Sequence, residues 1–294
     1  MKVIQHLSLA LLLSAVVVSA QTNQNQKPTD TKPAANPSTS AAQTPTPAGK
    51  HPPQAKSKAE FDAYVALMGM KDPAALEKAA DDFISKYPDS ELKSAAYQRA
   101  MVIYQQAGND DKTLEMGRKA LTFNPDDPGV LVAIADTLVE KTRETDLDKD
   151  ERLAEAVKNA QHALETVGDF PAPPNMPPEQ VAAVKNDLRS GAYTAIGAAA
   201  YTNKKYADAE TNFKQAVEVT KDNPDPTIML RLALAQDKQN KYPEALDTAN
   251  KILALPNLDP RVQQYAQQEK DRLSKLIPAA KPAAAPVPAP STPK

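Results

Sequence analysis

The amino-acid sequence predicts an all-α solenoid of stacked helix pairs, and three observations support this fold class. First, residues 58–277 carry a continuous helical pattern of apolar residues, which is broken only briefly and at turn residues. Second, no run of β-branched residues alternates with polar residues at a period of two, so no sheet is expected. Third, Lys205 and Tyr206 match Lys241 and Tyr242 at an offset of 36 residues, a period typical of helical solenoids.

Residues 1–20 are predicted to be a cleaved signal peptide. Lys2 provides a short positive start, residues 7–18 form an apolar run, and the small residue Ala20 suits cleavage before Gln21. The run is shorter than the roughly 20 apolar residues of a transmembrane helix, and no other segment is apolar enough to span a bilayer. We therefore expect an exported protein, periplasmic or secreted, that has no membrane span after cleavage.

Two proline-rich segments flank the helical region. Residues 21–57 are rich in Gln, Asn, Thr, Pro and Ala, residues 278–294 are rich in Ala and Pro, and neither segment has an apolar period. Segments of this composition bury too little apolar surface to offset the entropy of ordering. A disordered tether and a disordered tail are therefore expected, either as contacts for the cell wall or as simple spacers.

Between these segments, turn residues divide the chain into five helix pairs and a terminal cap. Each helix is expected to hold about 12–15 residues, which is marginal alone in water, so each pair must bury its apolar stripe on its neighbours. The third pair carries an insertion between its two helices. In the cap, one apolar face holds Val262, Tyr265, Ala266, Leu273 and Leu276, and polar residues cover the remainder. The predicted repeats are residues 58–91, 92–127, 128–170, 178–225 and 226–258, and the cap is residues 259–277.

One copy of this repeat resembles the tetratricopeptide family, whose pattern is W-x₂-L-G-x₂-Y, then A-x₃-F, then P. The matching residues here are Tyr193, Ile196, Gly197, Ala200, Ala209, Phe213, Ala216 and, slightly late, Pro224. Less regular copies begin at Ala63, Tyr97, Leu131 and Met229, so that the resemblance covers about residues 58–258. The resemblance implies a right-handed superhelix in which small residues let the two helices of a pair approach closely.

In this family, the first helix of each pair lines a concave groove that holds an extended peptide or a helix. The family's carboxylate clamp needs Lys and Asn in its first repeats, whereas the middle lining here is small and apolar. An apolar or helical partner segment is therefore expected rather than a C-terminal carboxylate. By register, the groove residues are Gln98, Arg99, Val102 and Gln105; Val132, Ala133, Asp136 and Glu140; Thr194, Ala195, Ala198 and Tyr201; and Leu230, Arg231, Leu234 and Asp237.

The composition excludes most catalytic and metal chemistry. The chain has no cysteine, and its three histidines, His6, His51 and His162, lie far apart in the sequence. No nucleophile motif and no glycine-rich loop before a helix occur. Basic and acidic residues are interleaved, with a net charge of −2, so no nucleic-acid partner is expected. We predict that the protein is not an enzyme and needs no cofactor or metal.

Residues 145–151 contain an Asp-x-Asp-x-Asp sequence that resembles the first half of an EF-hand calcium loop. Glu151 replaces the glycine that such a loop requires, and Val157 stands where its bidentate glutamate belongs. A solvated loop that widens one repeat is therefore the better interpretation.

Two functions remain. The first is a protein-interaction scaffold or adaptor of the bacterial cell envelope, whose partner is a protein or peptide of unknown identity. Residues 83–90 support it, because they resemble the F-x-x-x-Y-P-x-S stretch of envelope-assembly tetratricopeptide proteins, although the lipidated cysteine of those proteins is missing. The alternative is a self-assembling structural module or an envelope-assembly factor. A homo-oligomer is possible because the first helix carries the large apolar residues Phe61, Tyr64, Val65 and Met68.

Overall fold

The computed structural model describes residues 52–173 and 175–277, and within this part of the chain it holds eleven α-helices and no β-strand. The all-helical fold class is therefore confirmed. The predicted signal peptide, most of the tether and the tail lie outside the described residues. The helices are α1 (Lys58–Met68), α2 (Pro73–Lys86), α3 (Lys93–Gln106), α4 (Asp110–Leu121), α5 (Pro128–Lys141), α6 (Lys149–Thr166), α7 (Pro178–Thr202), α8 (Tyr206–Val219), α9 (Pro226–Asp237), α10 (Tyr242–Leu253) and α11 (Pro260–Leu276), with a short 3₁₀ helix, η2 (Val167–Asp169), after α6.

Four helices begin at the same two-residue signal, an aspartate followed by a proline. Asp72, Asp127, Asp225 and Asp259 are the N-caps of α2, α5, α9 and α11, and each side chain accepts a hydrogen bond from a backbone N–H of the first turn. The proline that follows occupies the first helical position, where its missing N–H has no intrahelical partner to lose. These Asp-Pro steps fix the points at which the chain turns into the next helix.

Three helix pairs share one turn between their two helices. Gly108, Lys204 and Asn240 adopt positive φ values of 69°, 60° and 60° in the turns that join α3 to α4, α7 to α8 and α9 to α10. In each turn, the next residue donates its N–H to the carbonyl five positions earlier, at 2.9–3.1 Å. This left-handed step satisfies a carbonyl at the helix end. The 36-residue offset between Lys205-Tyr206 and Lys241-Tyr242 in the sequence therefore corresponds to the same turn at Lys204 and Asn240.

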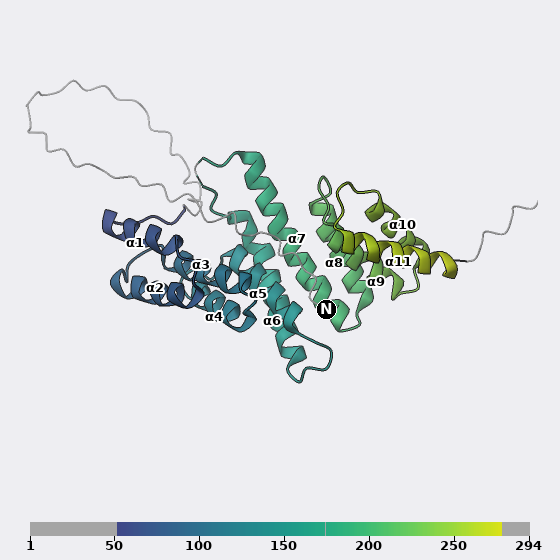
Figure 1. The fold of residues 1–294 in the computed structure, drawn as a ribbon, viewed down its shortest axis with the longest axis horizontal. Helices are drawn as coiled ribbons and strands as arrows, with labels where there is room; N and C mark the ends of the chain where they lie inside the picture. Colours follow the sequence, from purple (N-terminus) through teal and green to yellow (C-terminus); the bar gives the residue numbers. More distant parts are fainter. Residues whose placement is uncertain (1–51, 174, 278–294) are drawn as a thin grey trace, which may run out of the picture.

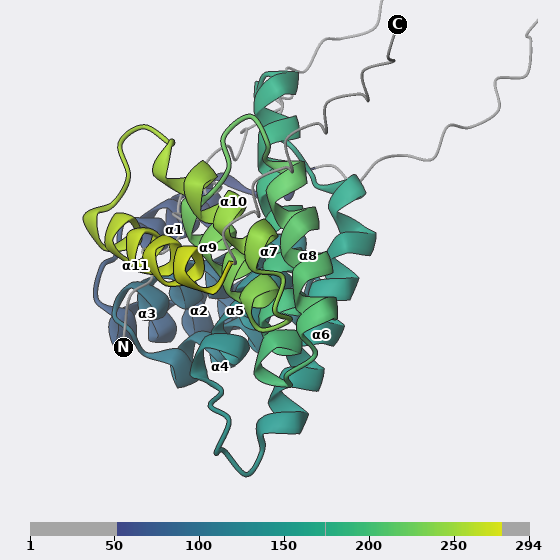
Figure 2. The same ribbon diagram turned by 90° about the vertical axis from the view of Figure 1, so that its right-hand side faces the viewer.

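The helices pack in chain order along an elongated body (Figures 1 and 2). The closest pairs are α3 with α4, α5 with α6, α7 with α8 and α9 with α10, and each pair also contacts the pair that follows it. On one side of the body, α5 contacts α7 and α9 contacts α11. The tetratricopeptide-like stacking that the sequence predicts is therefore the arrangement observed.

The predicted length of about 12–15 residues is wrong for three helices of the pairs. α6 has 18 residues and α7 has 25, whereas α1 has only 11. In α7 the extra length precedes Tyr193, where the family pattern begins, because residues 179–192 contain no proline to end the helix. Despite this length, neither α7 nor any other described helix is apolar enough to cross a bilayer.

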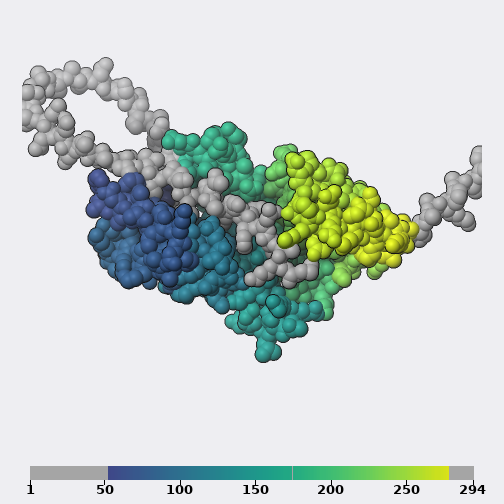
Figure 3. All heavy atoms as spheres, viewed as in Figure 1, coloured from purple at the N-terminus to yellow at the C-terminus, as the bar shows by residue number. Residues whose placement is uncertain are grey.

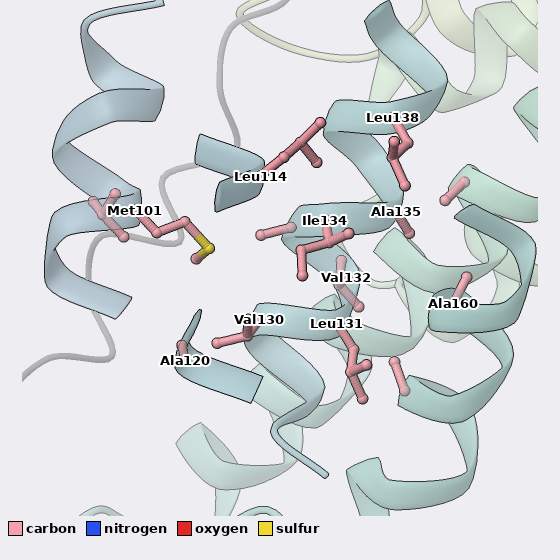
Figure 4. Packing of buried hydrophobic residues seen from close by; sticks show 14 of the residues in the cluster. Met101, Leu114, Ala120, Val130, Leu131, Val132, Ile134, Ala135, Leu138 and Ala160 are labelled. Atoms are coloured by element: carbon pink, nitrogen blue, oxygen red, sulfur yellow. The ribbon is translucent and has the colours of Figure 1, made fainter. Parts of the chain in front are cut away.

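Small residues let neighbouring helices approach closely, both within a pair and between pairs. Around α5, Ile134 lies among Met101, Leu114 and Leu138 in a buried layer (Figure 4). A Cβ added at Gly117 of α4 would lie 2.8 Å from Ile134 and 3.1 Å from the Met101 sulfur. Because ordinary contacts start near 3.4 Å, only glycine fits there.

The two ends of the solenoid differ in how well they are covered. In α1, Tyr64 is only 6% exposed and its ring lies 6.2 Å from that of Phe83, whereas Val65 is 50% exposed. In α11, Val262, Ala266 and Leu273 are buried against the α9–α10 pair, as a cap requires. Leu276 follows Leu273 by three residues on the same face, but it is 43% exposed in the last turn.

Candidate partner-binding groove

A groove of about 1030 Å³ runs between the first helices of the later pairs and the terminal helix. One wall is formed by α5 and the middle of α7, and the other by α9, the loop before it, and α11. α11 lies on the face seen in Figure 3, where it is coloured yellow. The lining residues are Gln105, Val132, Ala133, Asp136, Glu140, Asp187, Leu188, Ser190, Gly191, Thr194, Thr220, Asn223, Pro224, Asp225, Pro226, Thr227, Ile228, Leu230, Arg231, Leu234, Asp259, Arg261, Val262, Tyr265, Gln268, Glu269 and Arg272.

The structure brings part of the sequence-predicted set together in this groove. Its apolar wall on α9 comes from Leu230 and Leu234, which are half-buried and one helical turn apart. The predicted residues that line the groove are Gln105, Val132, Ala133, Asp136, Glu140, Thr194, Leu230, Arg231 and Leu234.

The other predicted residues serve the packing between helices. The Arg99 guanidinium donates to the Met70 carbonyl at 3.2 Å, so it joins α3 to the α1–α2 loop. The Tyr201 ring packs against the Tyr206 ring at 5.2 Å. Outside the groove lining are Gln98, Arg99, Val102, Ala195, Ala198, Tyr201 and Asp237. Of these, Val102, Ala195 and Ala198 are buried, and Gln98 lies 3.5 Å from the Asp127 carboxylate.

Sequence reasoning missed the contribution of α11 and of Asp187, Leu188, Ser190 and Gly191 in the middle of α7. The family register assigns the groove to the first helix of each pair, so the polar residues of the cap are expected only to cover its outer face. Instead, Arg261, Tyr265, Gln268 and Arg272 line the groove, because α11 also packs against α9. No local pattern in the sequence of α11 shows this second role, because it depends on how α11 packs against α9.

Several charges in and beside the groove already have partners within the protein. Asp225 and Asp259 cap their helices, as described above. Arg272 pairs with Asp237 of α9 at 2.5 Å and with Glu269 of its own helix at 2.8 Å. These two carboxylates raise the pKa of the Arg272 guanidinium further above its usual range. The Arg272 side chain therefore fixes α11 to α9 and contributes little positive charge to the groove.

Two acidic side chains lie together on the α5 wall. Asp136 and Glu140 lie one turn apart on α5, and Arg231 lies on the α9 wall. The surrounding protein and the neighbouring Asp136 raise the pKa of Glu140 to about 7, although Arg231 partly opposes the shift. Burial likewise raises the pKa of Asp187 on α7. Glu140 and Asp187 therefore carry their negative charge at a cost in free energy.

Thr194 adds an unused polar group to the same wall. The residue is 9% exposed, and among the described residues its hydroxyl finds no hydrogen-bond partner. Other helical threonines in this protein donate to the carbonyl four residues earlier, as Thr137 and Thr202 do at 2.7 and 3.0 Å. Buried hydroxyls without a partner are uncommon in folded proteins.

The two other constellations in the sequence have structural partners. His162 lies between Asp126, at 3.0 Å, and Glu165, at 3.3 Å, on the outer side of α6. In the 145–151 loop, Asp146 and Asp148 both pair with Arg152, at 3.3 and 2.6 Å. Within the described residues, no group of three His, Cys, Asp or Glu side chains is placed to hold a metal ion.

No protein-family model matches the sequence, and no curated protein matches it. Among solved structures, the chain is similar to pilF of Pseudomonas aeruginosa, with a TM-score of 0.49 and 18% identity over 76% of this chain and 96% of that one. A thermophilic TPR protein of Thermus thermophilus has a TM-score of 0.47 and 16% identity, covering 72% and 95%. PilW, a type IV pilus biogenesis factor, has a TM-score of 0.49 and 16% identity, covering 75% and 92%.

Proposed function

We propose that this protein is a non-enzymatic interaction scaffold or adaptor of the bacterial cell envelope, and that it binds a segment of a partner protein in the groove. The observation that carries this proposal is the groove itself, about 1030 Å³ in volume, with half-buried leucines on one wall and charged residues beside them. Recognition of a peptide or helix uses this combination, in which apolar contacts give affinity and charges fix the register.

The make-up of the lining favours binding over catalysis. The residues that line the groove include no histidine, lysine or cysteine, and the hydroxyl of Ser190 already donates to the Ala216 carbonyl at 3.0 Å. The Ser190 hydroxyl is therefore engaged with the backbone rather than placed beside a general base. The envelope location is supported by the signal-peptide pattern of residues 1–20.

The test is an affinity capture from envelope extracts of the source bacterium, with the full chain as bait. The Leu230→Glu plus Leu234→Glu variant places two charges on the apolar wall of the groove, and we expect it to lose partners that the unchanged chain recovers. Thr211→Glu plus Gln215→Glu is the matched control, because both residues are exposed on α8 outside the groove lining. Equal recovery by all three baits would refute the groove as the binding site.

A further inference from the structure

Several charged side chains of the groove have partners that stabilise the fold, and charged side chains line both of its walls. Helix capping accounts for Asp225 and Asp259, and the Arg272 ion pair accounts for Glu269. The other charged side chains of the lining are Asp136, Glu140, Asp187, Arg231 and Arg261.

These carboxylates and guanidinium groups belong to opposite walls. Asp136 and Glu140 stand on α5 and Asp187 on α7, whereas Arg231 and Arg261 stand on α9 and α11. Arg231 lowers the pKa of Glu140, but by less than the surrounding protein and Asp136 raise it. All three charged lining residues of the α5 and α7 wall are acidic, so this wall attracts positive rather than negative groups.

Two further observations on this wall point to a ligand. The free-energy cost that raises the pKa of Glu140 falls when a cation approaches, because an opposite charge favours the ionised carboxylate. Independently, the Thr194 hydroxyl is nine-tenths buried at the groove wall and has spare hydrogen-bonding capacity within the described structure. Rotation about the χ1 angle of Thr194 would let this hydroxyl meet a polar group in the groove.

Apolar surface lies within reach of the same carboxylates. Val132 and Ala133 are one turn before Asp136 on α5, and Leu230 and Leu234 stand on the facing wall. A cationic side chain that enters beside Glu140 is thus flanked by positions for apolar side chains. A single metal ion does not fit this lining, because it has no apolar groups to contact the leucines. A nucleic acid does not fit either, because its phosphates are negatively charged like the carboxylates of the wall.

From this geometry we infer that the groove recognises a protein segment in which a lysine or arginine stands among apolar side chains, with the cation held at Glu140 beside Asp136. This inference rests on the proposed function, since it names the chemistry of the partner that the same groove binds. The chain's own residues 278–294 compete for this role, because they carry Lys281 and Lys294, contain no acidic residue and follow α11 directly.

The experiment selects binders from a displayed library of random peptides about 16 residues long, which suffices for four helical turns. The full chain is the target, and selected peptides are then titrated by fluorescence anisotropy. We expect enrichment of Lys or Arg beside apolar residues, and an affinity about tenfold weaker for Asp136→Asn plus Glu140→Gln. Glu218→Gln plus Asp222→Asn removes the same charge from exposed positions outside the groove and should leave the affinity unchanged.

The remaining outcomes distinguish failure of the cation inference from failure of the groove as a binding site. Binders without basic residues that are lost in Leu230→Glu plus Leu234→Glu would overturn the cation inference and leave the groove function standing. Binders insensitive to both groove variants, or no binders at all, would count against both. If the chain that ends at Ile277 binds the basic peptides about tenfold more tightly than the full chain, the tail occupies the groove and replaces the external partner as its occupant. Circular dichroism melts verify that each variant is folded.

Discussion

A Cβ atom added at Gly197 of α7 would lie 2.8 Å from two ring carbons of Phe213 in α8, well inside ordinary contact distance. The ring is 1% exposed and cannot retreat, and the Ala209 carbonyl would lie 3.3 Å from the added atom. Gly197→Ala should therefore destabilise the protein by about 1–3 kcal/mol, although alanine is the better helix former. Urea unfolding measures this, with Gly168→Ala as a neutral control in open space. Equal midpoints for the two variants would disprove the close approach.

The repeated left-handed turn predicts opposite effects at two of its copies. Gly108 has φ +69° and open space around its Cβ position, so Gly108→Ala should cost about 1 kcal/mol through the backbone alone. Lys204 has φ 60° in the corresponding turn, so Lys204→Gly should raise the melting temperature by about 1–3 °C. The ion pair of Lys204 with Glu144 is solvent-exposed and adds little. Differential scanning calorimetry would contradict this account if both substitutions lowered the melting temperature.

Glu210 of α8 gives the stability a specific dependence on acid pH. Burial raises the pKa of this carboxyl, but hydrogen bonds from Lys214, Lys241 and Gln239 at 2.6–2.8 Å outweigh it and bring the pKa to about 2. Because the folded pKa is lower than the unfolded one, this contribution is fully present above about pH 4.5 and is lost as the pH falls toward 2.

Glu210→Gln should therefore lower the free energy of unfolding by about 1–3 kcal/mol at pH 7. The difference from the unchanged chain should shrink as the pH approaches 2. Glu218→Gln is the control, because its partner Lys221 lies 3.5 Å away at the exposed end of the same helix. A constant difference across the acid range would show that packing, not charge, explains the effect of Glu210→Gln.

Removal of the Arg272 guanidinium should loosen the terminal helix. The side chains of Asp237 and Glu269 are only 14% and 10% exposed, and Arg272→Ala leaves both without the cation that they share. We expect a loss of about 1–3 kcal/mol and faster hydrogen exchange confined to α11 and its contacts with α9 and α10. Arg261→Ala, at an exposed position in the first turn of α11, should leave the exchange of the helix unchanged. Uniform acceleration over all helices would argue against a local role.

Glu140 predicts a pH effect of opposite sign to that of Glu210. Its folded pKa of about 7 exceeds the unfolded value, so stability should fall as the pH rises from about 4.5 to 7. The groups that act on it are Asp136, Asp110 and, with opposite sign, Arg231. Glu140→Gln should abolish this component, which stays below about 1 kcal/mol because groove water screens the exposed side chain. The test is to measure the melting temperature of each variant from about pH 4 to 8. Asp136→Asn should show a pH dependence of the melting temperature between those of the unchanged chain and Glu140→Gln.

Local signals in the sequence were sufficient for the fold. The Asp-Pro steps at helix starts and the apolar stripes are determined by residues within one or two turns of each other. The small residue Gly197 predicted a close helix pair because the family pattern places it opposite Phe213. The left-handed turn at Lys204 was not predicted, since lysine carries no preference for positive φ and adopts it only because the helices on both sides demand it.

The groove could be predicted only in part, because it depends on contacts between distant elements. A register along first helices identifies Leu230 and Leu234, but it cannot show that α11 folds back onto α9 and adds Tyr265 to the lining. Likewise, Tyr201 follows the register but packs on Tyr206, because α7 and α8 meet at that point. Whether any of these residues contacts a partner remains a prediction.

α7 is one continuous helix of 25 residues, about 37 Å long, and it contacts α5 and α6 on one side and α8 and α9 on the other. In repeat solenoids, each helix pair contacts only its neighbours. Here one unbroken helix packs against both neighbouring pairs. A substitution that breaks α7, such as a proline in its middle, should therefore disturb the packing of both pairs at once.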